Sequence, residues 1–225
     1  MKPFINALVA AVSASAPLRA LVILLPSAAL FLFICCRRRS PPRANTGPSS
    51  VLAVFGSGGH TAEMISLLRA LPASRFAPRS YILADTDGTS LSRATAAGIS
   101  IAAPCVFLIP RAREVGGSWA GAVVGVLRGC AAAVRALRSA QPALLLVNGP
   151  GTCLPVVLAA HLMRVVGALR SDAQILFVES VCRVETLSLT GRILYVLRLA
   201  DGFLVQWPAL AARYPRAKCV GGTVL

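Results

Sequence analysis

Acidic residues and lysine are scarce in this sequence. Of the 225 residues, 8 are Asp or Glu and 23 are Lys or Arg, which gives a formal net charge of +15. Lysine occurs at Lys2 and Lys218 alone, and neither follows a glycine-rich turn. The phosphate-binding loop of P-loop NTPases needs a lysine there, so that class of protein is excluded. The excess of positive charge suits anionic lipid, phosphate-bearing ligands or nucleic acid.

Patterns of metal ligands and disulfides are also missing. The seven cysteines are odd in number, no two of them form a C-x-x-C pair, and the sequence has two histidines. A structural zinc site needs four such ligands at characteristic spacings. We therefore expect reduced, cytosol-facing thiols and neither a metal ion nor another cofactor.

An uncharged stretch near the N-terminus predicts a membrane anchor. The whole sequence is 56% hydrophobic and 14% charged, which is too apolar for a disordered chain. Residues 20–36 carry no charge, and as a helix they would rise about 25 Å, near the short limit for spanning a bilayer. Arg37, Arg38 and Arg39 follow directly, so the positive-inside rule favours a cytosolic C-terminal side. A cleaved signal peptide is the alternative, but a small-residue cleavage site would then stand where the arginines are.

These features divide the chain into three parts. Residues 1–36 are expected to anchor the protein, crossing the membrane once at 20–36 or lying partly at the interface. Residues 37–50 are basic and rich in Pro, Ser and Gly, which is typical of a linker. Residues 51–225 are expected to form one cytosolic domain.

The C-terminal domain alternates short apolar runs with longer helical patterns. This alternation is typical of βα units that build a parallel sheet. We predict a single Rossmann-like, doubly wound α/β domain, in which ligands bind beyond the carboxyl ends of the strands. The expected strands are 51–55, 81–84, 106–109, 144–147, 175–178, 203–205 and 219–220, and the expected helices are 62–71, 118–139, 154–166, 187–200 and 209–214.

The first strand is followed by a glycine-rich loop that opens a helix. Glycines let backbone N–H groups approach a ligand closely, and the N-terminus of the helix adds partial positive charge, so the expected ligand is a phosphate or diphosphate. A tight turn without ligand is the alternative. His60, at the mouth of this loop, is a candidate proton acceptor or a helix cap. The diphosphate-binding candidates here are Gly56, Ser57, Gly58, Gly59 and Thr61.

A second loop of the same kind follows the fourth predicted strand. It runs from Asn148 to Cys153 and contributes Gly149, Gly151 and Thr152 as further candidates. Two glycine-rich loops at one edge of a sheet suggest an extended anionic ligand that spans both. The alternative is that both are ordinary turns without a ligand, which would give the same sequence pattern.

Carboxylates also follow two of the predicted strands. Glu179 directly follows the strand 175–178 and is a candidate base, or a structural partner of Arg183 or Arg192. The run Asp85-Thr86-Asp87 is a D-x-D pattern, which in one class of glycosyltransferases holds a divalent cation. Because Asp-Gly turns are common where strands end, we interpret this run as a turn. His161 lies in an apolar helical run and is expected to be a packed residue.

Several of these segments together resemble a known family. From Val51 to Leu225 the chain resembles the asparagine-linked glycosylation fourteen family, and more distantly it is similar to the N-terminal half of the bacterial MurG family. The matching segments are 56–64, 84–87, 109–116, 148–153 and 177–180, with the most specific at 185–191, 200–201, 205–208 and 220–221.

The resemblance implies the acceptor-side half of a GT-B glycosyltransferase on the cytosolic face of the endoplasmic reticulum membrane. The implied reaction transfers GlcNAc from UDP-GlcNAc to O4 of GlcNAc-diphosphodolichol, with inversion to a β1,4 bond. The glycine loops would bind the acceptor diphosphate, and His60 or Glu179 would deprotonate the attacking hydroxyl. The implied partners are a soluble donor-binding subunit of the asparagine-linked glycosylation thirteen family and the dolichol-linked lipid, not nucleic acid. The implied enzyme uses no D-x-D metal.

Two other function classes stay open. One is a membrane-tethered scaffold that recruits an enzyme without contributing site residues. The other is a membrane-bound NAD(P)-dependent oxidoreductase, which is disfavoured because Thr61 stands where the dinucleotide fingerprint has Gly or Ala.

Overall fold

The structure is a computed structural model that describes residues 47–111 and 119–221. The predicted anchor and all but the last residues of the predicted linker lie outside these ranges. In the part of the chain that is described, no helix has the length and apolar character needed to cross a membrane. The described residues belong to one unit of the chain, Arg39–Leu225.

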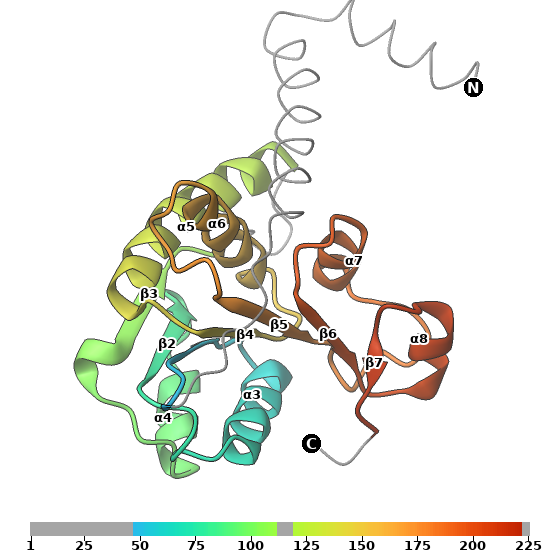
Figure 1. The fold of residues 1–225 in the computed structure, drawn as a ribbon, viewed down its shortest axis with the longest axis horizontal. Coiled ribbons are helices and arrows are strands. Elements are labelled where there is room, and N and C mark those ends of the chain that lie inside the picture. Colours follow the sequence, from blue (N-terminus) through green and yellow to red (C-terminus); the bar gives the residue numbers. More distant parts are fainter. Residues whose placement is uncertain (1–46, 112–118, 222–225) are drawn as a thin grey trace, which may run out of the picture. The chain divides into compact units, whose positions relative to one another are not determined.

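A single parallel sheet of seven strands forms the centre of this unit (Figure 1). The strand order β3-β2-β1-β4-β5-β6-β7 confirms the predicted doubly wound α/β fold. All strand pairs are parallel, and Val54 of β1 lies opposite Val147 of β4. The strands are β1 (Val51–Val54), β2 (Arg79–Ala84), β3 (Val106–Ile109), β4 (Leu144–Val147), β5 (Gln174–Val178), β6 (Gly202–Val205) and β7 (Lys218–Cys219).

Helices cover both faces of the sheet. In Figure 1, α3 (Gly59–Ala70) and α4 (Ser90–Ala96) lie on one face, and α5 (Trp119–Ala140) and α6 (Cys153–Val165) lie on the other. The remaining helices are α7 (Leu189–Val196), α8 (Pro208–Arg213) and a short 3-10 turn at Ala103–Cys105. Two predictions were wrong: α4 was not expected, and the helix expected at 187–200 is limited to Leu189–Val196.

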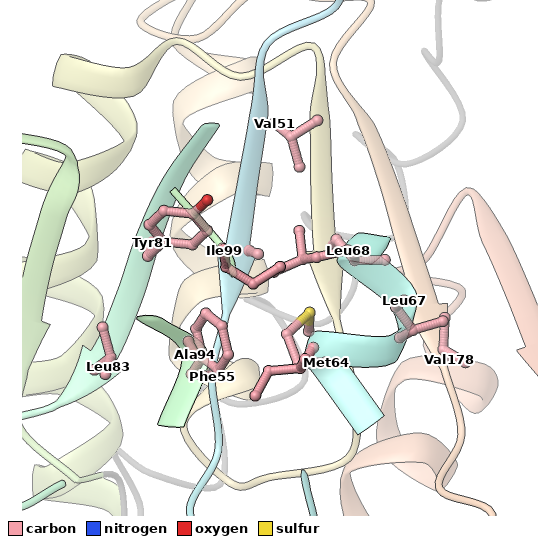
Figure 2. Close-up of a cluster of buried hydrophobic side chains, with 13 residues drawn as sticks. Val51, Phe55, Met64, Leu67, Leu68, Tyr81, Leu83, Ala94, Ile99 and Val178 are labelled. Carbon is pink, nitrogen blue, oxygen red and sulfur yellow. The ribbon is translucent and has the colours of Figure 1, made fainter. Parts of the chain in front are cut away.

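The apolar side of α3 packs into a cluster of buried hydrophobic residues. Met64 and Leu68 are fully buried and pack with Phe55 and Tyr81 from the sheet (Figure 2). The rings of Phe55 and Tyr81 lie 5.8 Å apart, and the Tyr81 hydroxyl donates to the carbonyl oxygen of Ser100 at 3.1 Å. This packing fixes the position of α3, and with it the glycine-rich loop from which α3 begins.

The strand order reverses between β1 and β4. The chain runs outward from β1 through β2 to β3, and then returns through α5 to β4 on the other side of β1. The helices that follow β1 and β4 therefore leave the sheet toward opposite faces, and a crevice opens between the two connections. Both predicted glycine-rich loops lie at this point.

Candidate functional site

A cleft of about 570 Å³ lies at the carboxyl ends of β1, β4 and β5. Both glycine loops and the loop between β5 and α7 border it. Of the predicted site residues, His60, Gly59, Gly149 and Gly151 line the cleft. The other lining residues are Glu63, Pro150, Ser180, Cys182, Arg183, Ser188, Leu189 and Thr190.

A smaller hollow of about 140 Å³ lies beside the cleft and shares Pro150 and Gly151 with it. Gly56, Ser57 and Thr152 line this hollow, together with Arg111 after β3. Six of the eight predicted diphosphate-binding residues are thus divided between two neighbouring depressions, and Gly58 and Thr61 line neither. Each depression also has one arginine in its wall, Arg183 in the cleft and Arg111 in the hollow.

The two glycine loops touch each other, and two glycines make this contact possible. A Cβ placed on Gly56 would come within 2.6 Å of Pro150 Cγ. Gly149 has a φ of +60°, and a Cβ there would come within 2.6 Å of His60 Cε1. Because Gly56 and Gly149 have no side chain, the two loops can pack directly against each other.

Gly59 and Gly151 have a different environment. A Cβ on either residue would meet nothing within 4 Å, and both line the cleft. Gly59 is the first residue of α3, and Gly58 before it has a φ of +68°. The first N–H groups of a helix lack partners within the helix, so the start of α3 offers donors to an anion.

Two predicted ligand residues, Thr61 and Thr152, are buried. Thr61 Oγ1 lies 2.6 Å from the carbonyl oxygen of Gly56 and 2.7 Å from Ser90 Oγ. Its side chain therefore holds the first glycine loop from beneath. Thr152 is 7% exposed, and its hydroxyl has no hydrogen-bond partner among the described residues.

His60 stands between the two loops with its side chain 33% exposed. Its Nδ1 lies 3.3 Å from Glu63 Oε2, and its backbone oxygen accepts a hydrogen bond from Asn148 Nδ2 at 3.0 Å. Gly58 occupies the N-cap position of α3, so the interpretation of His60 as the helix cap is wrong. The arrangement leaves His60 available as a proton acceptor at the cleft.

Glu63 is a site residue that the sequence analysis did not single out. Its Oε1 accepts hydrogen bonds from Ser180 Oγ at 2.6 Å and from the Val181 N–H at 3.2 Å. Its Oε2 faces His60, and Asn148 Nδ2 lies 3.4 Å from it. Burial by itself raises the pKa of Glu63, but the hydrogen bonds from His60, Ser180 and the Val181 N–H, together with the charge interaction with His60, outweigh burial, so this pKa lies below its ordinary value.

Glu179 directly follows β5, as predicted, but its carboxylate is enclosed. The residue is 1% exposed and does not line the cleft. Its Oε1 accepts from the Ser180 N–H, and its Oε2 accepts from the Ser188 N–H at 2.9 Å and from the Ser188 hydroxyl at 3.1 Å. Burial raises the pKa of Glu179 despite these hydrogen bonds. The geometry gives Glu179 a structural role, which is to secure the start of α7.

The D-x-D run forms a turn, as predicted. The Asp87 N–H donates to the Ala84 carbonyl oxygen, and Asp87 Oδ1 accepts from the N–H groups of Thr89 and Ser90 at the start of α4. Asp85 is exposed. Among the described residues, no group of three or more His, Cys, Asp or Glu side chains is placed to hold a metal ion.

His161 is a packed residue, as expected. It is 3% exposed, and its Nε2 contacts the carbonyl oxygen of Leu199 at 2.5 Å. It lies on α6 beside Arg164, far along the helix from the cleft-lining loop that precedes it.

Comparison with known proteins shows which family the chain matches. The family described as "Oligosaccharide biosynthesis protein Alg14 like" matches residues 51–223. The human protein named UDP-N-acetylglucosamine transferase subunit ALG14 is 39% identical over 184 residues, which cover 78% of this chain and 83% of that protein. The protein of the same name from Yarrowia lipolytica is 36% identical over 205 residues, covering 89% of this chain and 90% of the relative.

Solved structures show the same fold. MurG from Acinetobacter baumannii superposes with a TM-score of 0.53 at 18% identity, over 72% of this chain and 43% of that chain. A UDP-N-acetylglucosamine 2-epimerase, so titled as putative, from Listeria monocytogenes gives a TM-score of 0.52 at 14% identity, over 76% of this chain. This chain thus spans less than half of either structure, 43% and 42%.

Proposed function

The chain belongs to the Alg14 family of oligosaccharide biosynthesis proteins, and we propose that it is the acceptor-binding, membrane-anchoring subunit of a UDP-GlcNAc transferase. The acceptor is GlcNAc-diphosphodolichol, and the product carries a second GlcNAc in β1,4 linkage. The observation that carries this proposal is the cleft at the strand-order reversal, where two glycine loops meet beside His60.

The glycine loops bind the diphosphate of the acceptor. The start of α3 presents backbone donors, and the open space above Gly59 and Gly151 lets phosphate oxygens reach the backbone. Arg183 and Arg111 add positive charge on the two sides of Pro150. Charge of this sign suits a ligand with two phosphates, whose hydrogen bonds to charged donors are about twice as strong as neutral ones.

His60 is the base. It lines the cleft with one ring nitrogen held toward Glu63, and no described residue bonds Nε2. The proton of the attacking hydroxyl moves to Nε2, and the hydroxyl oxygen forms a bond to C1 of the donor sugar. The bond from C1 to the nucleoside diphosphate breaks on the opposite side, and UDP leaves with the electron pair, which inverts C1.

The donor is held by a second, soluble subunit of the asparagine-linked glycosylation thirteen family. The names of the relatives support a partner, because the human and Yarrowia lipolytica proteins are each described as a subunit of a transferase. The anchor at residues 1–36 keeps the pair at the cytosolic face of the endoplasmic reticulum membrane, where the lipid acceptor resides.

A reconstitution measures whether both chains are required. Transfer to a short-chain GlcNAc-diphosphoprenol is assayed with this chain alone, with the donor-binding subunit alone and with both. We expect product from the pair only. Full activity of the donor-binding subunit alone, on a soluble acceptor, would contradict an acceptor-binding role for this chain.

Gly59→Val separates this proposal from a scaffold role. A Cβ at this position meets nothing within 4 Å, so we expect folding and partner binding to stay intact, whereas the side chain occupies the space in which the diphosphate lies. We expect at least a hundredfold loss of kcat/KM for the acceptor, about 2.7 kcal/mol of transition-state binding. Normal turnover by an assembled Gly59→Val complex would favour the scaffold.

A further inference from the structure

Glu63 joins three loops that are far apart in the sequence. It lies on α3 three residues after His60, while its partners Ser180 and Val181 are 117 and 118 residues away. Asn148 from the second glycine loop completes the group. The side chain of Glu63 is 10% exposed, yet it lines the cleft. A carboxylate at such a site is held in one orientation by donors on both of its oxygens.

The direction of the His60–Glu63 hydrogen bond follows from these partners. Ser180 Oγ and the Val181 N–H both donate to Oε1, and Asn148 Nδ2 donates toward Oε2. These donors favour the ionised carboxylate, whose pKa lies below its ordinary value, and an ionised carboxylate only accepts, so we take His60 Nδ1 as the donor across the 3.3 Å to Oε2. A neutral imidazole carries one N–H, and with the proton on Nδ1 the other nitrogen, Nε2, is the acceptor.

The second glycine loop makes two further approaches to His60. Gly149 leaves room for the ring edge at Cε1, and Asn148 Nδ2 holds the backbone oxygen of His60 at 3.0 Å. The second glycine loop therefore holds the main chain of His60 and borders one edge of its ring. Glu63 contacts the ring at Nδ1.

We infer that Glu63 is the positioning residue of His60, fixing its Nδ1–H tautomer and stabilising the imidazolium that forms when Nε2 takes the acceptor proton. This inference rests on the proposed function for the identity of the proton donor. It assigns to Glu63 the role that the buried carboxylate plays beside the histidine in hydrolase triads, where loss of the carboxylate leaves the wrong tautomer.

Other charged or titratable groups lie near His60. Arg183 and Cys182, on the loop after β5, line the same cleft. Arg93 of α4 donates to the carbonyl oxygen of Gly58 at 2.9 Å. Residues 148–152 of the second glycine loop contain no titratable side chain. Replacing Glu63 alone leaves the cations in place, so its effect on pH dependence has a definite sign.

The test compares His60→Ala, Glu63→Gln and the double variant in the full chain assembled with the donor-binding subunit. His60→Ala lowers kcat by about 10²–10⁴-fold. Glu63→Gln lowers kcat by about tenfold or more, leaves the acceptor KM within about twofold, and moves the acid limb of the kcat profile to lower pH by about one unit. In the His60→Ala background, Glu63→Gln has no further effect on kcat. Asp172→Asn, at the amino edge of the sheet, is the matched control that removes a remote carboxylate.

Two results overturn the inference. One is an additive loss in the double variant, and the other is an unmoved pH profile for Glu63→Gln, since each would show that Glu63 only supports the loops. If His60→Ala keeps normal turnover, the assignment of the base under the proposed function fails instead.

A second measurement needs no variant at Glu63. The chain has two histidines, so the ring nitrogens of a 15N-histidine sample give few signals, and the His60 signals are those missing from His60→Ala. We expect the neutral ring of His60 to carry its proton on Nδ1. A proton on Nε2 would overturn the inference whatever the activity of the variants.

Discussion

Asp87 Oδ2 accepts a hydrogen bond from the Ser90 hydroxyl at 2.6 Å. Ser90 Oγ in turn lies 2.7 Å from Thr61 Oγ1, which contacts the carbonyl oxygen of Gly56. The second carboxylate of the D-x-D run therefore supports the first glycine loop through two hydroxyl groups. Asp87 therefore has a structural role, because it connects the turn after β2 to the glycine loop after β1.

These hydrogen bonds predict that substitutions of Asp85 and Asp87 have different effects on stability. Asp87→Ala removes the acceptor for the start of α4 and lowers stability by about 1–2 kcal/mol, whereas the exposed Asp85→Asn leaves stability and turnover unchanged. Thermal unfolding and transfer assays, with and without a chelator, check this. Equal loss of turnover in both variants, matched by the chelator, would instead indicate a metal held by the pair.

The two kinds of glycine at the site also behave differently when substituted. Gly56→Ala drives a methyl group against Pro150 and costs about 1–3 kcal/mol of unfolding free energy. Gly151→Ala meets no protein atom and keeps the stability, but raises the acceptor KM. Urea unfolding and acceptor titration measure the two effects, and Gly88→Ala, also in open space but outside the cleft, is the control. A Gly56→Ala protein as stable as wild type would show that the loops separate freely.

Ser180→Ala is expected to destabilise the protein in a pH-dependent way. The pKa of Glu63 in the folded protein is below its ordinary value of 4.5, so this carboxylate stabilises the fold above pH 4.5, and the effect is lost as pH falls through the lowered pKa. Removing the Ser180 donor costs about 1.5–3 kcal/mol at pH 7, and the cost shrinks in acid. Urea midpoints from pH 3 to 7 measure it, with Ser92→Ala on the surface of α4 as control. A cost independent of pH would contradict the role of the ionised carboxylate.

Arg164 carries a prediction that separates stability from activity. It donates to Asp201 Oδ2 at 3.3 Å and to the carbonyl oxygen of Ala173 at 2.9 Å, at the amino ends of β6 and β5. The side chains of this ion pair are 10% and 9% exposed. Arg164→Met removes the charged donor of both hydrogen bonds and costs about 1.5–3 kcal/mol.

The acceptor KM of Arg164→Met is expected to stay normal, because the cleft lies at the opposite ends of these strands. Arg170→Met is the matched control: its pair with Asp172 leaves the Arg170 side chain 34% exposed and contributes about 0–1 kcal/mol. Calorimetry measures the loss of unfolding free energy in both variants. Similar losses in the two would show that burial of the pair has no consequence.

The strands of the sheet could be predicted from the sequence, whereas the polar side-chain contacts around them could not. Each predicted strand lies within two residues of an observed one, since buried parallel strands are short apolar runs. Helix α4 was missed because its residues, Ser90–Ala96, are few and mostly small or polar, without an apolar stripe. Its start depends on Asp87, whose side-chain contacts a hydropathy pattern does not show.

At the site, the loops were predictable and the side-chain partners were not. Gly59, Gly151 and His60 line the cleft, as their places after β1 and β4 indicated. The enclosure of Glu179 depends on the position of Ser188 above it, which is a tertiary contact. Glu63 lies in the family-matching segment 56–64 and three residues after His60, but its contact with Ser180, 117 residues away, could not be predicted from the sequence.

The length of that connection has a consequence for synthesis on the ribosome. When β1 and α3 have emerged, Glu63 has no partner on its Oε1, because Ser180 and Val181 have yet to be made. Chain elongation at about 5–20 residues per second leaves a delay of several seconds before β5 and its loop can pair with it. The cleft is therefore completed only after β5 and its loop have been made, and a chain arrested before Val181 has both glycine loops but lacks the donors that hold Glu63 Oε1.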